Sequence, residues 1–139
     1  MKELQIAAKT ENLDTVFEFL DRELESCACN AKMQMQIRIA VEEIFTNISC
    51  YAYQETVGNA TIQIETDKDA VTITIMDKGM PYNPLEKDDP DITLSAKERQ
   101  IGGLGIFMAK NCMDHMEYAY RDESNILTLK KYLDTEKSN

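Results

Sequence analysis

The sequence predicts an α+β fold, a two-layer α/β sandwich with helices on one face of a mixed, mostly antiparallel sheet. Three observations lead to this class. Apolar residues recur at helical spacing over residues 13–53, two stretches in the middle of the chain alternate apolar and polar residues, and a glycine cluster precedes a further helix and two more strands. With 139 residues, 43% of them hydrophobic, the chain can close one core, so we expect a single domain over residues 1–139.

The N-terminal part of the chain is predicted to form one strand and two helices. Residues 3–8 alternate weakly, which is typical of a strand at the edge of a sheet. Residues 13–24 place their apolar side chains on one stripe of a helix, with Asn12 as its N-terminal cap. A longer helix is predicted from Ala31 to about Tyr53, because apolar residues recur there at spacings of three and four.

The middle of the chain predicts an antiparallel hairpin. Residues 60–67 and 70–77 alternate at period two, and a tight turn around Lys68 and Asp69 separates them. Residues 84–101 follow with proline, many charges and little periodicity. We expect them to form a long loop, and a loop of this length in a small domain is usually functional.

The C-terminal part predicts one helix and two strands. The helix covers residues 104–116, after the glycine cluster, and the strands cover residues 117–122 and 125–133. A polar turn at residues 123–125 joins the two strands. The predicted order of elements is therefore β-α-α-β-β-loop-α-β-β, as an α+β sandwich requires.

Composition excludes several classes of protein. A formal charge of −10 and a pI near 4.5 disfavour direct binding to nucleic acid, which depends on clustered Lys and Arg. Basic proteins are better partners for such a chain, although an acidic surface also simply favours solubility. The chain has no apolar run long enough to span a bilayer and no export signal at its start, so we expect a cytoplasmic protein with no membrane partner.

The cysteines and the one histidine give little indication of function. The four cysteines show neither a CxxC pair of the metal-binding type nor the density of a disulfide scaffold, so we interpret them as ordinary thiols. Cys27 and Cys29 would bind a metal only with ligands from elsewhere in the chain. His115 has no partner motif near it and is interpreted as structural.

Glu43 and Asn47 form the first candidate site. They lie four residues apart on the longer helix, so their side chains stack on one face one turn apart. The side-chain carbonyl of Asn47 is a ligand that Mg²⁺ accepts beside phosphate oxygens and water. Glu43 could take a proton from an attacking hydroxyl or water. The alternative is a solvated helix face, because this pair is common at this spacing.

Asp77 marks the second candidate site, where the hairpin ends. It follows a strand whose apolar residues share one face, and a carboxylate in such a setting needs a hydrogen-bond donor. An adenine amino group is a donor of this kind. Gly79 would let the ring lie against the backbone, and Pro81 and Pro84 would hold the exit rigid. A plain turn is the alternative.

The glycine cluster is the third candidate site. Gly102, Gly103 and Gly105 precede an apolar helix, and bare amides at the start of a helix attract phosphate. The cluster is not a P-loop, since it lacks GxxxxGK[ST], and it is not a dinucleotide fingerprint, since no GxGxxG follows a strand. A flexible entry to the helix is an equally good interpretation.

Together these segments resemble the N, G1 and G2 boxes of the GHKL ATPase and kinase superfamily, as Glu43-x-x-x-Asn47, Asp77-x-Gly79 and Gly103-x-Gly105. More narrowly, VEEIFTNISCYAY, DKGMPYNP and GGLGIFMAKNCMDHMEY resemble the bacterial anti-sigma factor serine/threonine kinase family. The resemblance covers nearly the entire chain. It has two departures: many relatives have a histidine where this chain has Tyr51, and a glycine is common where it has Pro81.

The resemblance implies roles for the residues of the first two boxes. Glu43 would be the general base that acts on a serine or threonine hydroxyl, and Asn47 would coordinate Mg²⁺. Asp77 would bind the adenine amino group, with Gly79 against the base and Pro81 beside it in the same box.

The resemblance also implies the contacts of the rest of the nucleotide, ATP or ADP. Residues 84–101 would form a lid, and Gly103, Leu104 and Gly105 would offer backbone amides to the phosphates. Thr128 matches a late strand position where the family often places a hydroxyl near adenine; a sheet-stabilising threonine is the alternative. Lys97 and Arg99, at the end of the lid, could reach the γ-phosphate or be solvated.

The function that the resemblance implies is an ATP-dependent serine/threonine protein kinase in transcription regulation. It would phosphorylate an anti-sigma-factor antagonist of the STAS type and sequester a sigma factor, and a homodimer is left open. The alternative is a nucleotide-responsive binding module, in which ATP changes the affinity for a partner without phosphoryl transfer.

Overall fold

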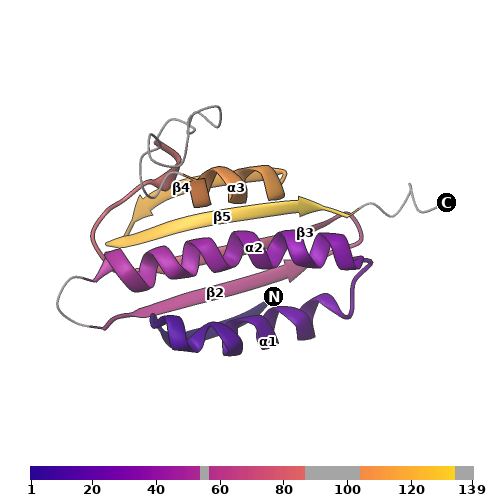
Figure 1. The fold of residues 1–139 in the computed structure, drawn as a ribbon, viewed down its shortest axis with the longest axis horizontal. Helices are drawn as coiled ribbons and strands as arrows, with labels where there is room; N and C mark the ends of the chain where they lie inside the picture. The colour runs from indigo at the N-terminus through magenta and orange to yellow at the C-terminus, as the bar shows by residue number, and fades with distance from the viewer. Residues whose placement is uncertain (54–56, 87–103, 134–139) are drawn as a thin grey trace.

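A five-stranded sheet forms one layer of the protein, and the helices pack on one of its faces (Figure 1). The computed structural model describes residues 1–53, 57–86 and 104–133. The strands are β1 (Lys2–Ala7), β2 (Asn59–Thr66), β3 (Ala70–Asp77), β4 (His115–Arg121) and β5 (Ser124–Tyr132), in the order β1-β2-β3-β5-β4. All neighbouring strands of this sheet are antiparallel. The predicted fold class is confirmed, with the refinement that the described sheet is antiparallel rather than mixed.

The helical layer consists of α1 (Leu13–Leu24), α2 (Ala31–Asn47) and α3 (Leu104–Cys112). In Figure 1, α2 runs along the middle of the sheet, with α1 on the β1 side and α3 on the side of β4 and β5. The short turns are the 3-10 turns Thr10–Asn12 and Pro84–Glu86 and the π-helical turn η2 (Ile48–Ala52). Within the described ranges, no helix has both the length and the apolar character that crossing a bilayer requires.

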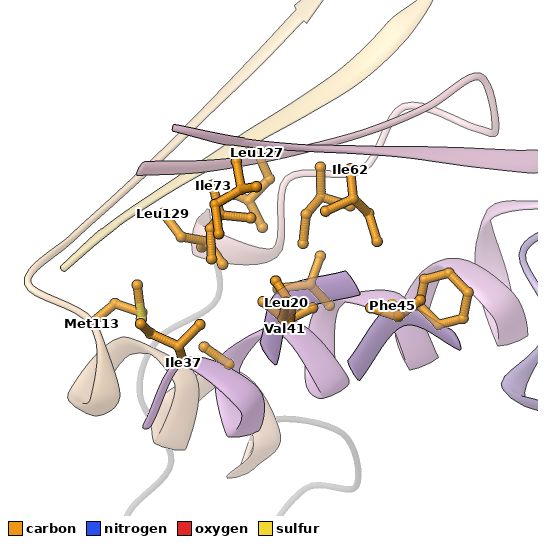
Figure 2. Packing of buried hydrophobic residues seen from close by; sticks show 14 of the residues in the cluster. Leu20, Ile37, Val41, Phe45, Ile62, Ile73, Met113, Leu127 and Leu129 are labelled. Atoms are coloured by element: carbon orange, nitrogen blue, oxygen red, sulfur yellow. The ribbon is translucent and has the colours of Figure 1, made fainter. Parts of the chain in front are cut away.

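The core lies between the two layers. The alternate residues of the central strands that face the helices are fully buried, and so are the apolar stripes of α1 and α2. Figure 2 shows the two sets meeting, with Ile62, Ile73, Leu127 and Leu129 opposite Leu20, Ile37, Val41, Phe45 and Met113. Burying each such side chain contributes roughly 1.5–3 kcal/mol to the stability of the fold. These contacts therefore fix the position of α2 on the sheet.

Helix ends differ from the sequence prediction where side chains intervene. Asn12 does not cap α1 with its side chain but donates from Nδ2 to the carbonyl of Ala7 at 2.9 Å. Asn30 caps α2 instead, accepting from the N–H of Met33 at 2.9 Å. α2 is α-helical only to Asn47 and continues to Ala52 as the π-helical turn η2.

The last helix is shorter than predicted, and the strand after it begins earlier. The ammonium of Lys131 donates to the carbonyl of Cys112 at 2.7 Å and closes the end of α3. Asp114 then joins the sheet, because its N–H donates to the carbonyl of Lys130 at 2.9 Å. As a result, β4 begins at His115, inside the stretch predicted as helix.

The final hairpin turns on two residues rather than on the predicted three. Asp122 and Glu123 have φ of 53° and 62°, the left-handed values that a two-residue type I′ turn needs. Arg121 therefore pairs with Ser124, and β5 begins at Ser124, one residue before the predicted start of this strand. Asn125 alternates with the buried Leu127 and Leu129, so its side chain lies on the buried, helix-facing side of the sheet.

Candidate functional site

A cavity of about 610 Å³ lies between the C-terminal half of α2 and the helix-facing side of the sheet, a volume typical of small-molecule sites. Three segments line it: α2 with η2, the exit of β3, and the β4–β5 hairpin. Four predicted site residues are among the lining: Glu43, Asn47, Asp77 and Pro81. The other lining residues are Ile44, Thr46, Ile48, Cys50, Tyr51, Ala52, Ile75, Met80, Tyr82, Pro84, Tyr118, Asn125 and Leu127.

Asp77 anchors one end of the cavity. Its side chain is buried, with 7% of its surface exposed, because it continues the helix-facing row of β3. Its Oδ1 accepts two hydrogen bonds at 2.9 Å, from the N–H of Gly79 and from Nδ2 of Asn125. The described residues place no donor on Oδ2, so this oxygen is available to a ligand in the cavity.

Asn125 holds this end together, and the sequence prediction missed it. Nδ2 donates to Asp77 and, at 2.9 Å, to the carbonyl of Met80, and Oδ1 accepts from the N–H of Tyr82 at 3.1 Å and from the Tyr118 hydroxyl. One side chain thus connects β3, its exit and β4. The alternation of Asn125, Leu127 and Leu129 in the predicted strand over residues 125–133 could have indicated it.

Gly79 packs against the end of η2. A Cβ at this position would lie 2.3 Å from the carbonyl oxygen of Ala52 and 2.6 Å from its Cβ. The next residue, Met80, donates its N–H to the same carbonyl at 2.9 Å. The glycine therefore fastens the exit of β3 to the end of the long helix, and Pro81 follows directly on the cavity wall.

Glu43 and Asn47 occupy the other end, on the face of α2 that borders the cavity. Glu43 is half-buried, and Asn47 hydrogen-bonds to it, as their spacing of one helical turn allows. Burial raises the pKa of the Glu43 carboxyl and outweighs the opposing effect of the Asn47 hydrogen bond; the charge of Glu42 raises it further. A carboxylate with a raised pKa in a cleft is suited to accept a proton.

The start of α3 lies directly against Glu43. A Cβ on Gly105 would be 2.2 Å from both Cδ and Oε1 of that carboxyl group, so only glycine allows this approach. Leu104 is the first residue of α3, and the backbone amides of this first turn have no partner within the helix. Gly103, most of the predicted lid (residues 87–101), Lys97 and Arg99 lie outside the described residues.

Thr128 is the one described site residue that the structure does not bring to the cavity region. It lies between the buried Leu127 and Leu129 on β5, so its side chain points to the sheet face opposite the helices. It pairs with Thr74 and Glu117 across the two neighbouring strands. The residue of β5 that meets Asp77 is Asn125.

The described side chains contain no group of three or more His, Cys, Asp or Glu that could hold a metal by itself. A Mg²⁺ ion would therefore need phosphate or water oxygens as most of its ligands, which is the usual arrangement for Mg²⁺ on nucleotides. Asn47 fits this arrangement, because donating its amide N–H to Glu43 leaves its side-chain oxygen for another partner.

Residues 6–131 match the family of the histidine kinase-like ATPase domain, and the chain belongs to that family. The serine-protein kinase RsbW of Bacillus mycoides (strain KBAB4) is 31% identical over 104 residues, which cover 72% of this chain and 64% of that protein. The anti-sigma F factor of Thermoanaerobacter sp. (strain X514) is 25% identical over 102 residues, or 73% of this chain and 71% of that protein. The predicted resemblance is thereby confirmed.

A solved structure has the same fold. The crystal structure of the RsbU and RsbW domains of Rv1364c from Mycobacterium tuberculosis superposes with a TM-score of 0.62 over 96% of this chain and 33% of that one. Its sequence identity is 17%, so the likeness concerns the fold alone. The match to RsbW of B. mycoides spans 64% of that relative's length, less than two thirds of it.

Proposed function

We propose that this domain binds ATP with Mg²⁺ and transfers the γ-phosphoryl group to a serine or threonine of a small regulatory protein. One observation carries the proposal: a single cavity has a buried acceptor, Asp77, at one end and a half-buried carboxylate beside the start of a helix, Glu43, at the other. Membership of the histidine kinase-like ATPase family and the names of the relatives support the same reaction.

Adenine would bind at the Asp77 end. The amino group of the base is a donor, and Oδ2 of Asp77 is the acceptor that faces no donor among the described residues. Apolar side chains such as Ile48, Ile75 and Leu127 also line the cavity and suit a planar ring. Asn125 acts here as a positioning residue, since its Nδ2 donates to Oδ1 of Asp77 and holds that carboxylate in place.

The phosphates would bind at the Glu43 end. The amides of Leu104 and Gly105, which have no partner within α3, favour a phosphate group, and the resemblance adds the amide of Gly103. Asn47 would supply one oxygen ligand to Mg²⁺, which when bound neutralises the charge that develops on the transferring phosphoryl group. Thr128 has no place in this arrangement, because it faces the other side of the sheet.

Phosphoryl transfer needs one proton to be removed. The hydroxyl oxygen of the substrate forms a bond to the γ-phosphorus as the bond to the β-phosphate oxygen breaks, ADP leaves, and the hydroxyl proton passes to Glu43. The raised pKa of Glu43 brings its basicity closer to neutral pH. Asn47 hydrogen-bonds to the Glu43 carboxylate, and Gly105 packs against it. The carboxylate is therefore held in position before the substrate arrives.

The protein partners follow from the relatives. One relative is named a serine-protein kinase and another an anti-sigma F factor, so we propose a STAS-type anti-sigma-factor antagonist as the substrate and a sigma factor as the sequestered partner. The formal charge of −10 on this chain suits a partner that presents a basic docking surface.

The test is incubation of the full chain with Mg²⁺, ATP labelled on its γ-phosphate, and candidate antagonist proteins from the same organism. Label on a serine or threonine of one antagonist, absent with Glu43→Ala, supports the kinase. If ATP and a partner bind but no label transfers, and Glu43→Ala changes nothing, the chain is a nucleotide-responsive binding module. If ATP does not bind to the folded chain, both functions are excluded.

A further inference from the structure

Outside the cavity, the connection between α1 and α2 brings two cysteines together. Cys27 is held by Leu24, whose carbonyl accepts from both the N–H and the thiol of Cys27, each at 3.3 Å. The N–H of Cys29 then donates to the carbonyl of Cys27 at 2.8 Å, which closes a γ-turn around Ala28. On the other side, Nε2 of Gln34 donates to the carbonyl of Cys29 at 3.2 Å. The turn is therefore fixed at both ends.

Within this turn the two thiols are hydrogen-bonded to each other. The Cys29 thiol donates to the sulfur of Cys27, which in turn donates to the carbonyl of Leu24. Both side chains are half-buried against the core. The Cα atoms of residues two apart are separated by at most about 7 Å in an extended chain. The γ-turn shortens this distance into the range of roughly 4.4–6.8 Å that a disulfide spans.

We propose that Cys27 and Cys29 form a reversible intramolecular disulfide by exchange with a low-molecular-weight disulfide such as oxidised glutathione. The thiolate of Cys27 attacks one glutathione sulfur and releases one glutathione thiolate, leaving a mixed disulfide. The thiolate of Cys29 then attacks the sulfur of Cys27 and releases the second glutathione. The two protons from the cysteines end on the two glutathione thiols, so oxidised glutathione is reduced as the dithiol is oxidised.

The local environment assigns the order of the two attacks. Burial raises the pKa of both thiols, and the neighbouring Cys27 adds to the effect of burial on Cys29, whose pKa is raised to about 11. For Cys27 the hydrogen bond from Cys29 opposes the effect of burial, so Cys27 is the better first nucleophile. The ammonium of Lys131, fixed by the carbonyl of Cys112, lies close enough to Cys29 to favour its thiolate in the second step.

This disulfide would be a switch rather than a staple. It encloses only Ala28, so the loop entropy that it removes from the unfolded chain is small. Partly exposed disulfides of this kind are readily reduced and are typically regulatory. Neither cysteine lines the cavity, so the inference does not depend on the proposed function.

The experiment equilibrates the full chain in defined ratios of reduced to oxidised glutathione, traps free thiols by acid quench and alkylation, and maps the products by mass spectrometry. Tryptic cleavage after Arg22 and Lys32 isolates both cysteines from Cys50 and Cys112. We expect the peptide 23–32 to lose both alkylation sites together, without a glutathione adduct, and to recover them with dithiothreitol. The Cys112→Ser variant should reach half oxidation of this peptide at the same ratio of reduced to oxidised glutathione as the wild-type chain.

Cys29→Ser removes the second nucleophile, so its peptide should instead retain one glutathione on Cys27. The proposal is overturned if wild-type peptide 23–32 remains alkylated at both cysteines at every ratio. It is equally overturned if each cysteine carries its own glutathione, or if the cysteines link two chains, because both results show that the paired thiols do not close on each other.

Discussion

The two ends of the cavity are built on opposite principles. At the Asp77 end a buried carboxylate and Asn125 form a network that reaches three segments of the chain. At the Glu43 end, Asn47 is the one side-chain hydrogen-bond partner that the described residues give the half-buried carboxylate, and Gly105 packs directly against it. One end is fixed by hydrogen bonds, and the other is fixed mainly by close packing.

This difference matches what each end would do. Recognising a base requires an acceptor that does not move, and the hydrogen bonds to Oδ1 of Asp77 hold its carboxylate in place while Oδ2 stays available. Accepting a proton requires a carboxylate whose charged form is not over-stabilised, and burial with few donors supplies that. Substitutions at the two ends should therefore separate binding from chemistry.

The largest effect is expected from Glu43→Gln. The amide keeps the shape of the side chain but cannot take the hydroxyl proton, so the phosphotransfer rate should fall by about 10²- to 10⁴-fold while ATP affinity changes little. Single-turnover transfer of labelled phosphate measures the rate. Glu42→Gln is the matched control, because Glu42 is exposed on the adjacent position and does not line the cavity. An equal loss in both variants would contradict the role given to Glu43.

Asp77→Asn should act on binding instead. Its side-chain oxygen can still accept from Gly79 and Asn125, but an NH₂ group replaces the free acceptor. A hydrogen bond to a charged group contributes about 1.5–3 kcal/mol, so ATP affinity should fall by about 10- to 100-fold. Asp67→Asn, the same change at the far end of the hairpin, should leave affinity as it is, since the Asp67 carboxylate accepts from the backbone of its own turn and does not line the cavity. Isothermal titration calorimetry measures the ATP affinity of both variants.

Two glycine substitutions compare the rigidity of the two ends. In Gly79→Ala the new Cβ meets the backbone of Ala52 at 2.3 Å, which cannot rotate away, so stability should fall by about 1–3 kcal/mol. In Gly105→Ala the new Cβ meets the Glu43 carboxyl at 2.2 Å, and that side chain can turn aside. We expect this variant to unfold at the wild-type denaturant concentration or above, but to transfer phosphate more slowly. Equal destabilisation in urea would show that the two contacts do not differ.

The smallest effect is the pH dependence of stability. Because burial raises the pKa of Glu43, its contribution to stability is fully present below the ordinary glutamate pKa of about 4.3 and is lost as pH rises through the folded-state value. Glu43→Gln should thus match wild type at acid pH and become the more stable chain toward neutral pH. Urea titrations from pH 4 to 8 measure this difference. A difference that shrinks as pH rises would contradict the raised pKa.

The overall fold was predictable because each element has a clear period. The hairpin of β2 and β3 alternates strictly, and the stripes of α1 and α2 recur every three to four residues, so their buried faces follow directly. The ends of elements were less predictable. β4 begins early because Lys131 and Asp114 bind backbone groups of distant segments, which no local pattern records.

The candidate site was predictable in its segments but not in all of its residues. Glu43 and Asn47 share a helix face, and Asp77 ends an apolar strand, so their positions follow from local periodicity. Asn125 was missed because its partners Asp77, Met80 and Tyr82 lie more than 40 residues away in the sequence, and no local pattern records such contacts. Thr128 was chosen by resemblance, and only the register of β5 shows that it faces away.

The most direct test of the account is a calorimetric titration of the wild-type chain, Glu43→Gln and Asp77→Asn with ATP and Mg²⁺. We predict nearly equal affinities for wild type and Glu43→Gln, and an affinity about 10- to 100-fold lower for Asp77→Asn. No heat from the folded wild-type chain, or equal losses in the two variants, would contradict the assignment of base recognition and proton transfer to opposite ends of one cavity.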